Sequence, residues 1–178
     1  SEEVLSTRPV PPGAVALCAR GTGPGQYGYD LRDTATAAVV RPLTTLTAQG
    51  PDCRLTPLGD LAILGADDRT LLVRLADGVI LRQLALPLRR CRANVAATHV
   101  AGLSGARVVL VEWTTGKVVF DRALPGAEYV DVNRDGTQVL VADGTLNTAT
   151  VWSVATGRPI GVVEHRAFVF DAVFSADG

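Results

Sequence analysis

The sequence predicts an all-β fold built from four-stranded antiparallel units that recur about every forty residues. Two turn motifs recur with one shared period, and short apolar stretches with a period of two flank both of them. No segment shows convincing helical periodicity. Residues 86–98 could be drawn as a helix, but the repeat places the second half of that segment on a strand.

The first marker is a turn between two apolar strands, as in VWSVATGRPIG at 151–161. Three further copies lie at 28–40, 72–82 and 110–120, and the copy at 28–40 is the weakest. The aligned turn positions are Thr34, Gly78, Gly116 and Gly157. Their intervals of 44, 38 and 41 residues define the period.

The second marker is a polar residue that opens a tight turn before an apolar strand, as in NRDGTQVLVADG at 133–144. The opening residues are Thr56, Asn94, Asn133 and Ser175. They lie 38, 39 and 42 residues apart. Two independent markers with the same period indicate a true internal repeat.

Each repeat contains four short strands. In the best-defined unit we expect them near 128–132, 138–142, 148–154 and 159–163, where valines suit a half-buried pleated surface. Gly, Asp, Asn and Thr occupy the intervening turns, which these residues favour.

Four-stranded units at this spacing predict a β-propeller, because one unit alone cannot bury both of its faces. The expected units are 14–43, 53–87, 91–124 and 127–163, with the start of a fifth at 167–178. Residues 1–13 are expected to form a linker or N-terminal segment. Both ends of the sequence look like cuts, since it begins with Ser and stops straight after a strand-like segment, so we expect a partial ring within a longer polypeptide.

The last third of the chain resembles the WD-repeat propellers. Trp152 stands where that family has its Trp, with Ser153 in place of the Asp, and His165 stands where the family has the His of its Gly-His pair. The segment 175–178, SADG, matches the family's Ser-Pro-Asp-Gly turn. The resemblance implies structural roles for Trp152, His165, Asp177 and Gly178.

The earlier repeats depart from this pattern. At the Trp-Asp position they carry Tyr29-Asp30, Val73-Arg74 and Val111-Glu112, and Trp113 is two places out of register with Trp152. Other propellers, such as quinoprotein-like or lactonase-like ones, therefore remain open for the first two-thirds. The resemblance implies seven or eight blades in all, so the remaining blades would come from the rest of a longer polypeptide or from a second chain.

Composition narrows the classes of function. The 178 residues carry a net charge of −1, which gives no general attraction to nucleic acid or to anionic membranes. No apolar run reaches the length of a membrane-spanning helix. Three cysteines without CxxC spacing argue against a disulfide framework and against a zinc site.

The stretch GTGPGQYG at 21–28 contains the spacing Gly23-x-Gly25-x-x-Gly28, which resembles a dinucleotide-binding loop. Such a loop must open a helix, yet the following residues alternate like a strand. Pro24 also removes one backbone donor. We therefore interpret 21–25 as the turn between the second and third strands of a blade.

The resemblance implies a non-enzymatic propeller that recognises a protein or peptide and serves as scaffold or sensor in a larger, bacterial and cytoplasmic protein. Turns after second strands and loops between blades supply the candidate contact residues. These are Asp67, Asp68, Arg69, Arg89, Arg90, Asp143, His165 and Arg166. We expect no catalytic residue, no metal and no cofactor.

Two alternatives stay open. A propeller enzyme, either a hydrolase or a quinoprotein-like oxidoreductase, would need matching polar residues from successive blades. At one repeat position the chain offers the unrelated residues Asp30, Arg74, Glu112 and Ser153. The second alternative is a purely structural arc that pairs with another chain to complete the ring.

Overall fold

A computed structural model describes residues 2–9, 14–48, 50 and 52–175. These residues form sixteen strands and no helix, which confirms the predicted all-β fold. The strands make four antiparallel sheets of four strands each, and within every sheet the strands follow chain order. The chain divides into two compact units, Ser1–Pro87 and Leu88–Gly178, and each unit contains two sheets.

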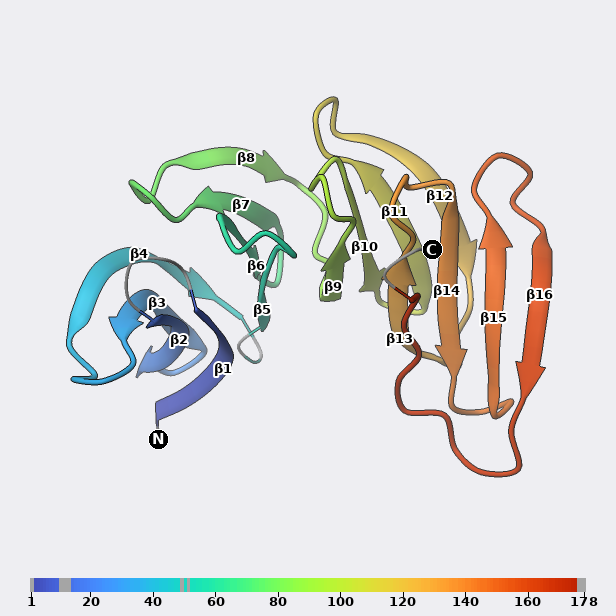
Figure 1. The fold of residues 1–178 in the computed structure, drawn as a ribbon, viewed down its shortest axis with the longest axis horizontal. Helices are drawn as coiled ribbons and strands as arrows, with labels where there is room; N and C mark the ends of the chain where they lie inside the picture. Colours follow the sequence, from blue (N-terminus) through green and yellow to red (C-terminus); the bar gives the residue numbers. More distant parts are fainter. Residues whose placement is uncertain (1, 10–13, 49, 51, 176–178) are drawn as a thin grey trace. The chain divides into compact units, whose positions relative to one another are not determined.

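The first unit holds the sheets β1–β4 and β5–β8 (Figure 1). The strands of the first sheet are β1 (Glu2–Pro9), β2 (Ala14–Gly23), β3 (Gln26–Asp33) and β4 (Val39–Thr47). Those of the second are β5 (Asp52–Leu55), β6 (Leu61–Gly65), β7 (Thr70–Arg74) and β8 (Ile80–Leu84). Residues 1–13 were expected to be a linker or N-terminal segment, whereas the described part of this segment, Glu2–Pro9, pairs along β2 as the first strand of its sheet.

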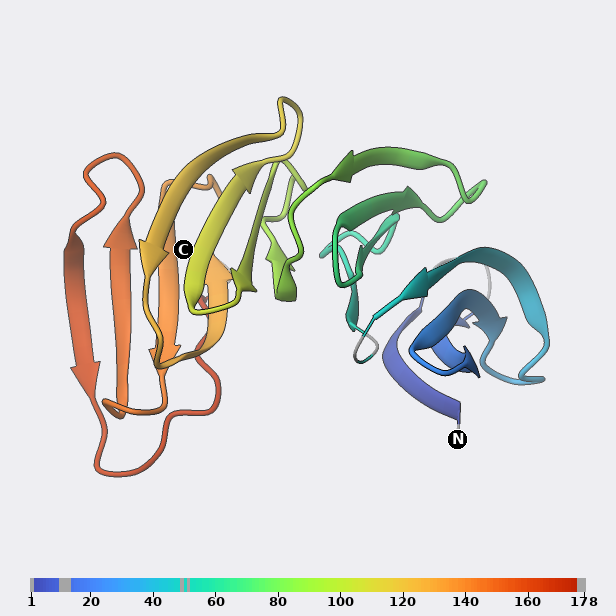
Figure 2. The same cartoon turned by 180° about the vertical axis from the view of Figure 1, so that it is seen from behind.

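The second unit holds the sheets β9–β12 and β13–β16, seen from both sides in Figures 1 and 2. Its strands are β9 (Arg89–Ala93), β10 (His99–Ser104), β11 (Arg107–Glu112), β12 (Lys117–Ala123), β13 (Ala127–Val132), β14 (Gln138–Asp143), β15 (Thr148–Ser153) and β16 (Pro159–Glu164). The four strands predicted for the best-defined repeat agree with β13–β16 to within one residue at each end.

The turn between the third and fourth strands has the same backbone geometry in all four sheets. In three of them a glycine with positive φ donates its N–H to the residue four places earlier, namely Gly78 to Arg74, Gly116 to Glu112 and Gly157 to Ser153. In the first sheet Ala37 makes this bond to Asp33 with a φ of +56°.

Ala37, rather than Thr34, is therefore the structural counterpart of the three glycines. With this correction the aligned turn positions lie 41, 38 and 41 residues apart. In the first repeat, Arg32-Asp33 rather than Tyr29-Asp30 then stands at the Trp-Asp position. The sequence alignment was wrong here because an alanine holds the left-handed conformation for which glycine is the usual residue.

The polar residues of the second marker are buried at the turns between first and second strands. Thr56, Asn94 and Asn133 are only 0%, 2% and 8% exposed. The Oδ1 of Asn94 accepts the N–H of His99 at 2.9 Å, and the Oδ1 of Asn133 accepts that of Gln138 at 2.9 Å. The Oγ1 of Thr56 accepts the N–H of Leu61 at 3.3 Å. A short polar side chain therefore closes each turn from inside.

The glycine-rich stretch forms a β-hairpin, and strand β3 follows it rather than a helix. Gly23 pairs with Gln26, so the turn itself is Pro24-Gly25, where Gly25 has a φ of +64°. Residues 21–23, expected in the loop, belong to β2. The position of Gly28 is crowded, because a Cβ there would lie 3.1 Å from the methyl group of Thr22.

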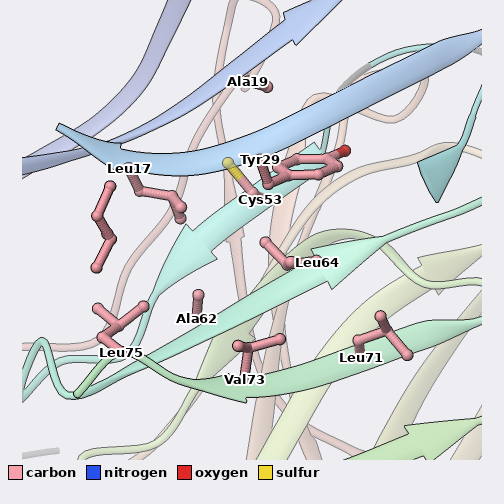
Figure 3. Packing of buried hydrophobic residues seen from close by; sticks show 10 residues of the cluster. Leu17, Ala19, Tyr29, Cys53, Ala62, Leu64, Leu71, Val73 and Leu75 are labelled. Carbon is pink, nitrogen blue, oxygen red and sulfur yellow. The ribbon is translucent and has the colours of Figure 1, made fainter. Parts of the chain in front are cut away.

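Within the first unit the two sheets pack face to face through a hydrophobic cluster (Figure 3). Leu17, Ala19, Tyr29 and Leu31 project from the first sheet. The second sheet contributes Cys53, Ala62, Leu64, Leu71 and Val73, with Leu75 directly after β7. Burying apolar surface between two sheets is the stabilisation that one isolated blade lacks.

The second unit repeats this packing. Ala101, Val108, Leu110 and Phe120 of the sheet β9–β12 meet Val130, Val132, Val139 and Val141 of the sheet β13–β16. Asn94 also crosses between the sheets, since its Nδ2 donates to the carbonyl of Arg134 at 3.1 Å. The ring of His99 packs over Gly136, where a Cβ would collide with it.

Candidate functional site

The predicted contact residues Asp67, Asp68 and Arg69 line a pocket in the first unit. The turn between β6 and β7 supplies them, together with Ala66, and Thr45, Leu46 and Thr47 at the end of β4 form the opposite wall. The pocket has a volume of about 390 Å³. Such a volume lies at the lower end of the range for small-ligand sites, so it accommodates a side chain or two of a peptide.

Backbone contacts hold the two walls of this pocket in place. The N–H of Asp67 donates to the carbonyl of Thr47 at 3.1 Å, and the N–H of Ala66 donates to the carbonyl of Arg69 at 2.9 Å. The turn is thus tied both to itself and to the neighbouring sheet. Both sheets also pack on the buried cluster of the first unit, so backbone hydrogen bonds and core packing together hold the pocket walls.

The polar groups of the pocket are exposed and charged. The guanidinium of Arg69 makes a two-pronged ion pair with the adjacent carboxylate of Asp68, at 2.8 Å and 2.6 Å. This hydrogen bonding from Arg69 holds the pKa of Asp68 below its usual range, and the bonding to Asp68 raises the pKa of Arg69. With Asp67 and two threonine hydroxyls alongside, the rim combines acidic character with several hydrogen-bonding groups.

The other predicted contact residues belong to the second unit. Arg89 and Arg90 begin strand β9 rather than lying in a free loop, and Arg90 has a φ of +52°. The Nη1 of Arg90 contacts both the backbone carbonyl of Glu128 and its carboxylate, the latter at 2.8 Å. This pair joins β9 to the start of β13.

Asp143 is a turn-forming residue. Its Oδ1 accepts the N–H groups of Thr145 and Leu146, both at 2.9 Å. Its carboxylate also fills the space beside Gly126, where a Cβ would collide with it. These contacts explain why an aspartate ends β14. The described hydrogen bonds of its carboxylate stabilise the turn.

His165 and Arg166 follow β16 and are exposed. The backbone N–H of His165 donates to the carbonyl of Asn147 at 2.9 Å, and its Nδ1 lies 3.3 Å from the backbone N and O of Ala167. His165, Asp143 and Arg90 lie at one end of the second unit. At this end Asp143 pairs with Ala127, and Thr148 pairs with Glu164, the residue before His165.

Of the residues expected to be structural, Trp152 is half-buried and packs against the core of the second unit. Its ring meets Phe120 edge-on, with centroids 6.1 Å apart. The buried Nε1 of Trp152 has no acceptor among the described residues. Asp177 and Gly178 lie outside the described residues.

The four polar residues considered for an enzyme do not form a set. Asp30 pairs with Arg32 at 2.9 Å, and Arg74 pairs with Asp77 at 2.6 Å. The carboxylate of Glu112 accepts the hydroxyl of Thr115 at 2.6 Å, and the Oγ of Ser153 accepts the N–H of Thr156. Each residue serves its own turn or strand. In the part of the chain that the structure describes, no group of three or more His, Cys, Asp or Glu residues could hold a metal ion.

Sequence reasoning missed Thr45, Leu46 and Thr47. Neither repeat marker includes them, and the first unit was expected to end at residue 43. The available signal was residue type, because the threonines at 44, 45 and 47 favour a strand that continues beyond residue 43.

Comparison with known proteins identifies no family. No family model matches the chain, and no curated protein matches it either. Among the described residues, no helix is long and apolar enough to cross a membrane.

Proposed function

We propose that this chain is part of a propeller-type recognition module that binds a peptide segment of a partner protein. The observation that carries the proposal is the pocket between the end of β4 and the turn between β6 and β7. It combines walls held by core packing, two hydroxyls, two carboxylates and one guanidinium within about 390 Å³. Groups of this kind fix the orientation of a ligand, while the surrounding sheets keep them in position.

The repeated architecture supports this proposal in a second way. Buried apolar contacts hold all four sheets, and a buried polar residue in the first turn also holds the sheets β5–β8, β9–β12 and β13–β16, so the sheets act as a scaffold. The turns between second and third strands vary in length and charge without disturbing that scaffold. On this proposal the module resembles WD-repeat propellers in function as scaffold or sensor, and a bacterial, cytoplasmic setting belongs to the same proposal.

A peptide library displayed on phage and selected against the full chain tests the proposal. Selected peptides are then synthesised, and their Kd is measured by fluorescence anisotropy for the wild type and for the double variant Asp68→Ala/Arg69→Ala. Both side chains are exposed, so the variant retains the fold. We expect at least a tenfold loss of affinity, about 1.4 kcal/mol, since two charged contacts are removed.

The matched control is Arg107→Ala/Asp121→Ala, which deletes an equally exposed ion pair on β11 and β12 of the second unit. Peptide affinity should not change in this variant. The proposal is wrong if no peptide is enriched, or if the selected peptides bind the pocket variant as tightly as the wild type.

A further inference from the structure

The sheet β13–β16 is apolar on both of its faces. Directly opposite residues on antiparallel strands point to the same side, so the register defines each face. One face carries Val130, Val141 and Val139 and packs on the sheet β9–β12. The opposite face, called here the outer face, has two mainly apolar rows and one polar pair. The rows are Asp131, Leu140, Val151 and Gly161, and Tyr129, Ala142, Ala149 and Val163, and the pair is Gln138 and Ser153.

A one-sided sheet alternates between apolar and polar residues, because one of its faces meets water. In the outer face only Asp131 is charged. The second face therefore has the composition of a buried surface. Yet Val163 is 67% exposed, and the whole of β16 is exposed.

The preceding sheet shows what such a face meets. In β9–β12 the corresponding row is Arg92, Ala101, Leu110 and Phe120. Each of these residues lies 39 or 41 positions before its counterpart in the row that begins with Asp131. Ala101, Leu110 and Phe120 of this row pack on the sheet β13–β16. The same repeat position thus already serves as a contact between sheets.

Residues 168–175 lie where the first strand of a next sheet would begin. After β16 the chain runs back along β13 and β14, as Figures 1 and 2 both show. The N–H of Phe174 donates to the carboxylate of Asp131 at 2.8 Å, and the ring of Phe168 packs against Gly144. Phe174 is 42 residues after Val132, so the segment repeats the sequence position of β13.

This segment is not part of any described strand, although the sequence predicts the start of a repeat there. Three of its apolar side chains face solvent, since Phe168, Phe170 and Val173 are 43%, 75% and 63% exposed. The rings of Phe168 and Phe170 lie against each other, with centroids 4.4 Å apart, and Val163 at the end of β16 is exposed as well. Exposed apolar side chains that gather in this way mark an interaction site.

We propose that the outer face of β13–β16 is a docking surface for a further four-stranded antiparallel sheet of the same repeat, with residues 168–175 as its first strand. The sheet would lie on the row from Asp131 to Gly161, with Val163 beside it, in the way that β13–β16 lies on Ala101, Leu110 and Phe120. The interface continues one already present in the second unit, which is why a sheet of this repeat, rather than a helix or a ligand, is its occupant.

The test is to supply the other three strands of the proposed sheet. Residues 133–136 and 175–178 occupy the same position in the sequence repeat, so a copy of 137–164 is appended directly after Gly178 of the full chain. Hydrogen–deuterium exchange is then followed by mass spectrometry. We expect amides of 168–175 to exchange about a hundredfold more slowly than in the parent chain, because strand pairing protects them. Val173→Pro in the extended chain should abolish this protection, since proline cannot donate to a sheet ladder.

A second measurement keeps the proposal falsifiable if the appended copy does not fold. The parent chain should bind the apolar dye ANS, and Val163→Ser and Phe170→Ser should each reduce the fluorescence. The control Leu58→Ser removes an equally exposed leucine from the first unit and should leave the signal unchanged. Dye binding that is indifferent to Val163 and Phe170 would overturn the proposal. So would a parent chain that dimerises through Val163 while the extended chain gains no protection, because the occupant would then be a second copy.

Discussion

The buried asparagine at the first turn of β9–β12 provides the sharpest energetic prediction. Asn94 is 2% exposed and makes three hydrogen bonds. Its Oδ1 accepts the N–H of His99 at 2.9 Å, and its Nδ2 donates to Thr98 Oγ1 at 2.9 Å and to the carbonyl of Arg134 at 3.1 Å. A net contribution of about 1 kcal/mol for each bond predicts that Asn94→Ala lowers the free energy of unfolding by about 3 kcal/mol.

Urea denaturation followed by tryptophan fluorescence measures this loss. Both tryptophans, Trp113 and Trp152, lie in the same unit as Asn94, so the signal reports on that unit. With a slope of about 2 kcal/mol per molar urea, the midpoint should fall by about 1.5 M at an unchanged slope.

The comparison variant is Asn133→Ala, in which the side chain closes its own turn by bonds to Gln138 and Thr137. Two bonds predict a loss of about 2 kcal/mol, about 1 kcal/mol less than for Asn94. A loss below about 0.5 kcal/mol for Asn94→Ala would refute the reasoning, because surface substitutions produce changes of that size.

Three further predictions follow from the turns and the buried cysteines. Ala37→Gly should raise the free energy of unfolding and Gly116→Ala should lower it, because both positions have positive φ. Each change should be up to about 1 kcal/mol in urea denaturation. Changes of the opposite sign would contradict the turn assignment. The pKa of Asp77 is lowered to about 2, first by the hydrogen bond from Arg74. The stability that this carboxylate gives the fold is therefore complete above about pH 4 and is lost as the pH falls towards 2. Asp77→Asn should therefore show a flatter dependence of the urea midpoint on pH between 2 and 4, and a wild-type slope in that variant would count against the pair. The thiols of Cys18, Cys53 and Cys91 are buried, so a thiol reagent such as DTNB should label them only after unfolding. Fast labelling of the native chain would show that these sites are open.

The repeat was the part of the structure that the sequence predicted best. The strands of β13–β16 were expected nearly residue by residue, because valines alternate there between turns marked by Asn, Asp and Gly. The positions Thr56, Asn94 and Asn133 were expected as turn residues, and the structure adds that they are buried and bonded from inside. Local chemistry fixes these features, which is why one sequence is enough to predict them.

Two errors came from features that local chemistry does not fix. The first repeat was aligned at Thr34 because Ala37 gives no sign of its positive φ. Strand β1 was missed because its pairing with β2 is a tertiary contact, and the segment that contains it looks like a proline-containing linker. The sequence predicted no pocket, although it pointed to Asp67, Asp68 and Arg69, which line one wall, as candidate contact residues. The other wall comes from a different sheet, and only the three-dimensional packing brings Thr45 and Thr47 to it.

Hydrogen–deuterium exchange of the unmodified full chain, resolved by residue with NMR, tests the central claim of stacked four-stranded sheets most directly. Protection should rise and fall with the repeat, because inner strands such as β10, β11 and β14 are buried, whereas outer strands such as β4 and β16 are largely exposed. We expect slow exchange in the second and third strands of all four sheets and fast exchange in β16. Protection that runs evenly through β16, or that ignores the forty-residue period, would contradict the account.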